Sequence, residues 1–300
     1  MPDVRSALAA IDASPRPPGS PLEAYQAHIL SQHEEDGLTY ELLKRAGMTT
    51  RRCVEIGCGH NGGNAGFMVA GLGFTGLFLD GDPELVGMGR QLFRDLLVTI
   101  EPAWITRETV NDLLRQHGMT GEIDYLGIDL DGVDYWIWDA ITVVSPRLVI
   151  VEYNPAFGLE LAVTIPYRPD FSRHRMAALG TRAEYYHGVS LAALARLAKR
   201  KGYRLVATAP ASQNAYFLRN DVALGTPAIT ASTGWRVPTK LKHRLALARV
   251  GNDPLRYFAE QGAPLVDVTG TVPRLLEARR PCRSCCERAE GLWPRARMDQ

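Results

Sequence analysis

The stretch "CVEIGCGHNGGNAGF", residues 53–67, decides the fold of this chain. A short apolar run leads into glycines at positions 57, 59 and 62, which have the spacing G-x-G-x-x-G, and a helix-like stretch follows. Such glycines allow a tight turn and let a ligand approach the backbone closely, and the start of the helix offers free N–H groups. In this strand–loop–helix setting, the pattern predicts a loop that binds a nucleoside-bearing ligand.

Strand-like and helix-like stretches alternate around this loop. The expected strands cover 53–57, 76–80, 96–100, 123–130, 147–153, 204–210 and 214–221, and the expected helices cover 63–71, 84–95, 107–117, 134–143 and 190–203. This alternation predicts an α/β fold with a parallel sheet and helices on both faces. The gap between the last two strands is too short for a parallel crossover, so the last strand is expected to pair antiparallel.

The two ends of the chain differ from this pattern. Residues 12–21 contain four prolines, so 1–21 is expected to be a flexible arm. The core domain is expected at 22–221, and it starts with a helical pattern over 22–46 that breaks at "EEDG" and ends at Gly47. Residues 222–300 are expected to form an extension with helices near 239–249 and 253–261, through which two subunits could pair as a homodimer.

Composition narrows the class of protein. Hydrophobic residues make up 46% of the 300 residues, charged residues make up 22%, and the net charge is +1. This balance is ordinary for a soluble globular protein and indicates neither nucleic-acid nor membrane binding. The N-terminal apolar patch is too short for a secretion signal, so a cytoplasmic location is expected.

Five cysteines do not suggest a disulfide framework. Two of them, Cys53 and Cys58, flank the start of the glycine loop. The other three, Cys282, Cys285 and Cys286, lie in a polar tail with no fourth metal ligand nearby in sequence. The tail is therefore expected to be polar and not a zinc site.

An acid at the end of the second strand supports nucleoside binding. Asp80 lies 23 residues after Gly57, where a carboxylate can accept hydrogen bonds from both hydroxyls of a ribose. The pattern fits NAD as well as S-adenosylmethionine. An NAD-linked oxidoreductase therefore stays open, although no Tyr-x-x-x-Lys proton relay accompanies the tyrosines at 185 and 186.

A longer series of motifs resembles the FkbM-type branch of the class I S-adenosylmethionine-dependent methyltransferases. The stretches are "SQHEEDG" (31–37), "VEIGCG" (54–59), "FTGLFLDGDP" (74–83), "ITRETVNDLL" (105–114), "IDYLGIDLDGVDYWIWDAI" (123–141), "PRLVIVEYNP" (146–155) and "GVSLAALARLAKRKGYRLVATAPASQNAYFLRND" (188–221). The resemblance implies a Rossmann-like seven-stranded sheet with six parallel strands and an antiparallel last strand. It also implies methyl transfer from S-adenosylmethionine, often to an oxygen of a small molecule or sugar.

The same resemblance implies which residues hold the methyl donor. The acid-x-G-x-G motif puts Glu55, Gly57 and Gly59 at the methionine part of the donor. Asp80, Gly81 and Asp82 are expected at the ribose of the donor. Ile105 and Thr106 are expected at the adenine, where Trp104 is an alternative stacking partner. Asp129 is expected to make a further contact with the donor. The chain departs from the family in the loop, where His60 or Asn61 stands in place of a common Asp.

Carboxylates are expected to gather at the ends of two neighbouring strands. Asp129 and Asp131 end the fourth expected strand, and Glu152 ends the fifth. They could supply a general base, because crowded carboxylates raise one another's pKa, or they could bind Mg²⁺. A third interpretation is that the two aspartates cap the next helix. His60 is a further candidate base.

The stretch between the fifth strand and the helix at 190–203 is expected to overhang the acceptor pocket. Candidate substrate contacts are Asn154, Arg168, Tyr186 and His187, and the same region contains Arg173, His174, Arg175, Arg182 and Tyr185. A basic lid would suit a carboxylated or phosphorylated acceptor. A protein that binds S-adenosylmethionine but transfers another group, or none, is an alternative function.

Overall fold

A seven-stranded mixed sheet forms the centre of the computed structural model, which describes residues 2–17, 19–173, 185–209, 211–239 and 241–276. The strand order is β3-β2-β1-β4-β5-β8-β7. The strands are β1 (Arg52–Ile56), β2 (Thr75–Asp80), β3 (Val98–Pro102), β4 (Gly121–Ile128), β5 (Val144–Glu152), β7 (Tyr203–Ala209) and β8 (Asn214–Arg219). Strands β1 to β5 pair in parallel, and β8 runs antiparallel to both β5 and β7. The predicted fold, with six parallel strands and an antiparallel last strand, is confirmed.

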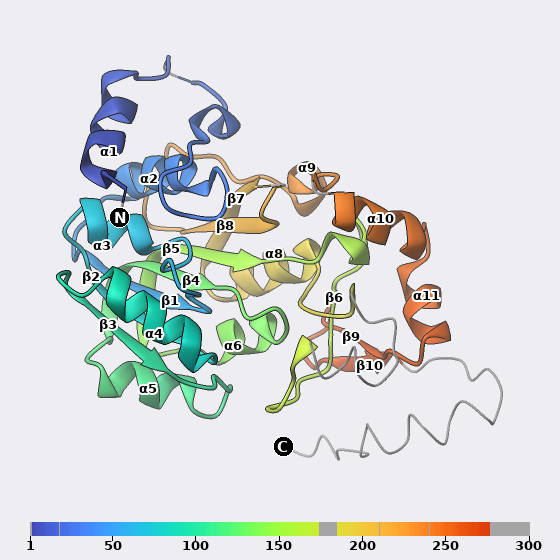
Figure 1. Ribbon diagram of the computed structural model, residues 1–300. Helices are drawn as coiled ribbons and strands as arrows, with labels where there is room; N and C mark the ends of the chain where they lie inside the picture. The colour runs from blue at the N-terminus through green and yellow to red at the C-terminus, as the bar shows by residue number, and fades with distance from the viewer. Residues whose placement is uncertain (1, 18, 174–184, 210, 240, 277–300) are drawn as a thin grey trace.

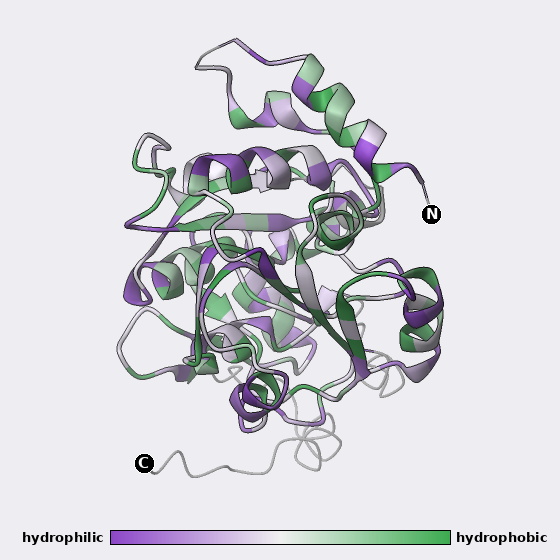
Figure 2. Ribbon diagram, turned by 90° about the vertical axis from the view of Figure 1, so that its left-hand side faces the viewer, coloured by the Kyte–Doolittle hydropathy of each residue, from purple (hydrophilic) through white to green (hydrophobic). Residues whose placement is uncertain are grey.

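Helices cover both faces of this sheet (Figure 1). One face packs on α5 (Val110–Gln116), α6 (Asp134–Ala140) and α8 (Leu191–Arg200). The other face packs on α2 (Glu35–Ala46), α3 (Gly66–Gly71) and α4 (Pro83–Leu92). Figure 2 shows hydrophobic residues concentrated in the strands between these layers. Because both faces are covered, the central strands are apolar on both sides, as expected for a buried parallel sheet.

Local sequence signals explain several helix ends. The Ser190 side chain accepts a hydrogen bond from the Ala193 N–H and so caps α8. Gly47 follows α2 with φ of 83°, a conformation that favours glycine and ends the helix. Both ends were predicted from the sequence.

The N-terminal region differs from the prediction in two ways. Residues 1–21, predicted as a flexible arm, contain helix α1 (Val4–Ala13), whose Val4 and Leu8 are buried beside Gly71 of α3. The "EEDG" sequence does not interrupt a helix, because α2 begins at Glu35 and the region 22–34 forms the short 3₁₀ helix η1 (Leu22–Tyr25) followed by irregular structure.

Asp36 explains where α2 starts. Its carboxylate accepts hydrogen bonds from the backbone N–H groups of Ile29, Leu30 and Ser31, at 2.6–3.0 Å. A buried acid in the first helical turn therefore folds the preceding segment back over the helix. The third strand also differs slightly, since it begins at Val98 and not at residue 96.

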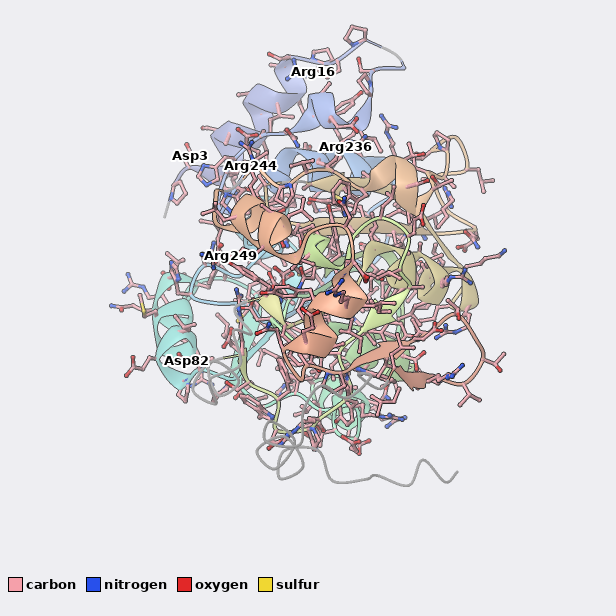
Figure 3. The ribbon with its side chains drawn as sticks, turned by 90° about the vertical axis from the view of Figure 1, so that its right-hand side faces the viewer. Asp3, Arg16, Asp82, Arg236, Arg244 and Arg249 are labelled. Carbon is pink, nitrogen blue, oxygen red and sulfur yellow. The ribbon has the colours of Figure 1, made fainter. Side chains whose placement is uncertain are left out.

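A second, smaller sheet was not predicted. It joins β6 (Val163–Thr164) to β9 (Leu265–Asp267) and β10 (Arg274–Leu276) of the C-terminal extension. The extension also contains α9 (Ala231–Gly234), α10 (Leu241–Val250) and α11 (Pro254–Glu260), close to two of the predicted helices. Figure 3 views the molecule from this side, where Arg244 and Arg249 of α10 are exposed.

The expectation of a polar tail without a zinc site concerns Cys282, Cys285 and Cys286, which lie outside the described residues. Within the described ranges, the helices are all too short or too polar to cross a bilayer.

We expect Asp124→Asn to lower the free energy of unfolding by roughly 1.5–3 kcal/mol, because charge-assisted hydrogen bonds to a buried group are lost. Asp124 is fully buried in β4, and its carboxylate accepts hydrogen bonds from the N–H groups of Thr49, Thr50 and Arg51. Urea denaturation gives the measurement. The exposed Asp112→Asn is the control and should change stability by less than about 1 kcal/mol. Equal effects of the two substitutions would contradict this account of the turn before β1.

Candidate active site

A large cavity lies where the carboxyl ends of the parallel strands meet the start of antiparallel β8. Its volume is about 1150 Å³. It is lined by the segment before α2, the glycine loop, the ends of β2, β4 and β5, the segments 103–105 and 171–173, and the β7–β8 turn at 212–214. Ligands of open α/β sheets bind at this edge. The volume exceeds the roughly 300–1,000 Å³ of a typical ligand pocket, so two ligands fit side by side.

Close backbone packing fixes the glycine loop against the end of β4. Gly57 has φ of 84°, and a Cβ atom built on it would lie 1.7 Å from the Asp129 carbonyl oxygen. Only glycine therefore fits at this position. Gly59 also has positive φ, at 54°, and both glycines line the cavity. The loop that starts at β1 and the loop that ends β4 are thereby held together.

Asp80 connects the end of β2 to the glycine loop. Its Oδ2 accepts a hydrogen bond of 2.8 Å from the Gly59 N–H, and its Oδ1 accepts one of 2.9 Å from the Asp82 N–H. Asp82 in turn caps α4, accepting a hydrogen bond from the Glu84 N–H. Gly81 allows Trp104 to lie close by, since a Cβ atom there would be 3.1 Å from the indole. Asp80, Gly81 and Asp82 all line the cavity.

Glu55 is a fully buried acid beneath the glycine loop. Its Oε1 accepts a hydrogen bond from the Asn64 N–H at 3.0 Å, and the buried Tyr125 hydroxyl lies beside the same carboxyl group. The side chain fits because Gly63 and Gly127 leave room for it. Burial raises the pKa of Glu55 to about 8, against the weaker opposing effect of the Asn64 hydrogen bond.

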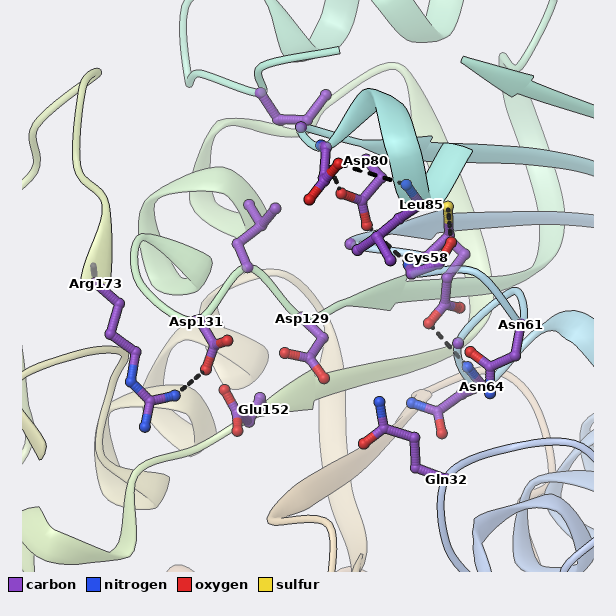
Figure 4. A pocket seen from close by; sticks show the side chains of 18 of the residues that line it. Gln32, Cys58, Asn61, Asn64, Asp80, Leu85, Asp129, Asp131, Glu152 and Arg173 are labelled. Carbon is purple, nitrogen blue, oxygen red and sulfur yellow. Dashed lines mark hydrogen bonds and ion pairs between the residues drawn. The ribbon is translucent and has the colours of Figure 1, made fainter. Parts of the chain in front are cut away.

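Three carboxylates converge at the ends of β4 and β5, as predicted for Asp129, Asp131 and Glu152 (Figure 4). Arg173 lies in the segment between β5 and α8, hereafter the insertion, and pairs with Asp131 at 2.5 Å. Burial raises the pKa of Glu152 well above its ordinary value, and repulsion from Asp129 and Asp131 raises it further. The cluster thus has more negative groups than its one described arginine can balance.

Asp134 holds the loop that carries two of these acids. Its carboxylate accepts hydrogen bonds from the N–H groups of Leu130, at 2.7 Å, and Gly132, at 3.0 Å. Burial raises the pKa of Asp134 to about 6. The N-cap position of α6 is Val133, so the interpretation that Asp129 and Asp131 cap this helix does not match the structure. Their carboxylates line the cavity instead.

A histidine lies behind this cluster. The ligand atoms of Asp131, Glu152 and His187 all lie within 4.8 Å of one another, and His187 is buried. Two carboxylates and an imidazole could hold a divalent metal ion. The sequence placed His187 near the acceptor but not beside these acids.

Of the other predicted site residues, Ile105 lines the cavity but Thr106 and His60 do not. Ile105 is buried and lines the cavity, whereas the Thr106 hydroxyl pairs with Thr109 and does not line it. His60 is exposed and also lies outside the lining.

The residues expected to contact the acceptor instead form hydrogen bonds or ion pairs within the chain. The Asn154 side chain donates hydrogen bonds to the carbonyls of Tyr185 and His187, and the Tyr186 hydroxyl donates one to the Pro264 carbonyl. Arg168 pairs with Asp170 at 2.9 Å. None of these candidates belongs to the cavity lining. His174, Arg175 and Arg182 lie outside the described residues.

Two segments of the lining were not predicted. Gln32, His33 and Glu35 reach the cavity from the segment that Asp36 folds back, although "SQHEEDG" was recognised as a motif. Gln213 and Asn214 reach it from the β7–β8 turn. The antiparallel direction of β8 was the available signal, because it brings the start of that strand to the ligand-binding edge.

Comparisons with known proteins give only distant similarity. No family model and no curated protein matches the chain. A TehB-like SAM-dependent methyltransferase from Corynebacterium glutamicum matches with 11% identity over 60% of this chain and 86% of its own, with a TM-score of 0.33. The N-terminal domain of EvdMO1 with SAH bound matches with 13% identity over 63% and 80%, with a TM-score of 0.39. An O-methyltransferase from Bacillus cereus in complex with SAH matches with 15% identity over 51% and 66%, with a TM-score of 0.33. These values are too low to carry a function to this chain.

We expect Glu55→Gln to flatten the pH dependence of stability between about pH 5 and pH 8. The folded protein keeps the Glu55 proton up to about pH 8, whereas the unfolded chain loses it near its ordinary pKa of 4.5. Rising pH across this window therefore favours unfolding by up to about 1.4 kcal/mol per pH unit from this group. Denaturant titrations at pH 5.5 and 7.5 measure the difference. Parallel wild-type and variant profiles would show that Glu55 keeps no raised pKa.

Proposed function

We propose that this protein is an S-adenosylmethionine-dependent methyltransferase that methylates an oxygen of a small molecule. Two observations support the proposal. The sheet has antiparallel β8 between β5 and β7, and Asp80 at the end of β2 is hydrogen-bonded to the glycine loop. A dinucleotide-binding sheet continues its strand order 3-2-1-4-5-6 in parallel instead. This difference favours the methyl donor over NAD. The finer assignment to the FkbM-type branch rests on the sequence motifs.

The site has the chemistry that the ribose of the donor requires. A carboxylate offers about four lone-pair positions, and each Asp80 oxygen uses one position for a backbone N–H. Two hydroxyls can therefore bind Asp80 without displacing the glycine loop. The adenine would then lie between Leu85 and the 103–105 segment, where Ile105 offers a buried apolar surface. The acidic end formed by Glu35 and Glu55 would face the ammonium group.

The carboxylate cluster would serve proton removal. When bound, S-adenosylmethionine supplies an electrophilic methyl group on a sulfonium. We assign Glu152 as the general base that accepts the proton of the acceptor hydroxyl, because it lies at the end of β5 and lines the cavity next to Asp129. The ion pair of Asp131 with Arg173 would hold the insertion over this end of the cavity.

A divalent cation is the second candidate for activating the acceptor. The set of Asp131, Glu152 and His187 favours it. An imidazole ligand suits Mn²⁺, Fe²⁺ or Zn²⁺ better than Mg²⁺, which prefers oxygen ligands alone. In that case Glu152 would bind the metal ion and not the proton.

We expect S-adenosylhomocysteine to bind the purified protein and NAD⁺ not to bind. Asp80→Ala should weaken binding of S-adenosylhomocysteine by about 10- to 150-fold, because charge-assisted hydrogen bonds to the ribose are lost. Isothermal titration calorimetry measures both ligands. The control is Asp95→Ala, an exposed acid outside the cavity, which should leave the affinity unchanged. Binding of NAD⁺ in place of S-adenosylhomocysteine would refute the proposal.

Removing metal ions separates the two ways of activating the acceptor. With Glu152 as base, protein treated with EDTA should keep its methyl-transfer rate, and Glu152→Gln should lower kcat by about 10²- to 10⁴-fold. Transfer of a radiolabelled methyl group to a panel of small hydroxylated molecules gives the measurement. Loss of activity in EDTA with recovery on adding Mn²⁺ would instead establish the metal site.

A further inference from the structure

The end of the cavity away from Asp80 presents hydrogen-bond acceptors. Asp131 and Glu152 supply carboxylates there, and the register pairs Glu152 directly with Asn214 of β8. The side-chain oxygens of Gln213 and Asn214 are buried and lack hydrogen-bond partners among the described residues, and both residues are only 2% exposed. A buried acceptor without a donor is costly, so a ligand that brings N–H or O–H groups would stabilise this wall.

The backbone holds one of these amides in an unusual conformation. Gln213 has φ of 63°, a left-handed conformation that few residues other than glycine adopt. Its carbonyl accepts a hydrogen bond from the Tyr153 N–H at 2.9 Å, next to Glu152. The turn is thus fixed to the end of β5. Strained backbone conformations of this kind cluster at active sites and ligand-binding sites.

The charge of the cavity lining also disfavours an anionic acceptor. Among the described lining residues there are eight acids and one residue of the Lys or Arg type, Arg173. Arg173 is already paired with Asp131, and Arg168, outside the lining, is paired with Asp170. The described arginines of the insertion therefore leave no strong attraction for an anionic acceptor. Anionic acceptors would also be repelled by the carboxylates at the cavity end.

Repulsion between these carboxylates gives a reason for a positive partner. Asp129, Asp131 and Glu152 line the same end of the cavity, and Arg173 is the one described Lys or Arg residue that lines it with them. An ammonium group placed among them would replace repulsion with attraction and would supply up to three N–H donors. A neutral polyol could satisfy the acceptors but would leave the repulsion in place.

We propose that the methyl acceptor is a cationic small molecule whose protonated amino group binds among Asp131, Glu152 and the Gln213–Asn214 turn. This inference rests on the proposed function for the identity of the reaction, but the amine site itself is a property of the cavity. It predicts that positive charge, and not a particular carbon skeleton, decides which molecules bind at this end.

Ligand-observed NMR with charge-matched probes tests the proposal. The probes are glucosamine, glucose and glucuronate, together with a fragment set of equal numbers of protonated amines, neutral polyols and carboxylates of similar size. Each is measured with and without saturating S-adenosylhomocysteine. We expect amines to be enriched at least threefold over carboxylates among the molecules that bind, and glucosamine to bind more tightly than glucuronate.

Substitutions of Asp131 and Glu152 test whether the amine probes bind in the cavity. Asp131→Asn and Glu152→Gln should each weaken amine binding about tenfold or more, through loss of a charge-assisted hydrogen bond. The Asp131 side chain is 55% exposed, so its variant keeps the test valid even if Glu152→Gln does not fold. The control Asp139→Asn alters a 45% exposed acid of α6 outside the cavity and should leave amine binding unchanged.

The outcomes separate this proposal from the proposed function. Hits dominated by carboxylates or polyols, the absence of any amine hit, or amine binding that survives both cavity substitutions would overturn the amine site. Failure of S-adenosylhomocysteine to bind in the same samples would refute the methyltransferase proposal alone, because the amine measurement without it still reports on the carboxylate cluster.

Discussion

The structure depends on the close approach of Gly57 to the backbone carbonyl of Asp129. No side chain fits between them, because a Cβ atom on Gly57 would overlap the oxygen. The contact joins the loop after β1 to the loop after β4 and leaves the cavity open above them. Asp80 adds the second connection, since its carboxylate binds the Gly59 N–H. The glycine loop and the carboxylate cluster are therefore joined at one edge of the sheet.

Acidic groups shape the rest of the site, and backbone N–H groups hold several of them. Asp134 fixes the loop after β4, and Asp36 fixes the segment before α2, each by accepting hydrogen bonds from successive N–H groups. These acids position others that line the cavity. Burial raises the pKa of Glu55 and of Glu152, and repulsion from Asp129 raises both further. Crowded acids of this kind suit a site whose proposed ligands, a sulfonium and an amine, are positively charged.

Much of this arrangement could be predicted from the sequence, because it follows from strand ends. Parallel strands place Asp80, Asp129 and Glu152 at one edge whatever the loops do. The short gap before β8 likewise required an antiparallel strand. What could not be predicted depends on tertiary contacts. The sequence suggests Asn154 as a ligand contact, but its side chain binds the carbonyls of Tyr185 and His187. Gln213 lines the cavity from a turn with a positive φ that the sequence does not indicate.

A crystal structure of the complex with S-adenosylhomocysteine is the decisive experiment. We predict that both ribose hydroxyls bind the Asp80 carboxylate while the Gly59 N–H keeps its hydrogen bond, with the sulfur facing Asp129 and Glu152. A ribose bound away from Asp80, or a cavity without the nucleoside at saturating concentration, would contradict it.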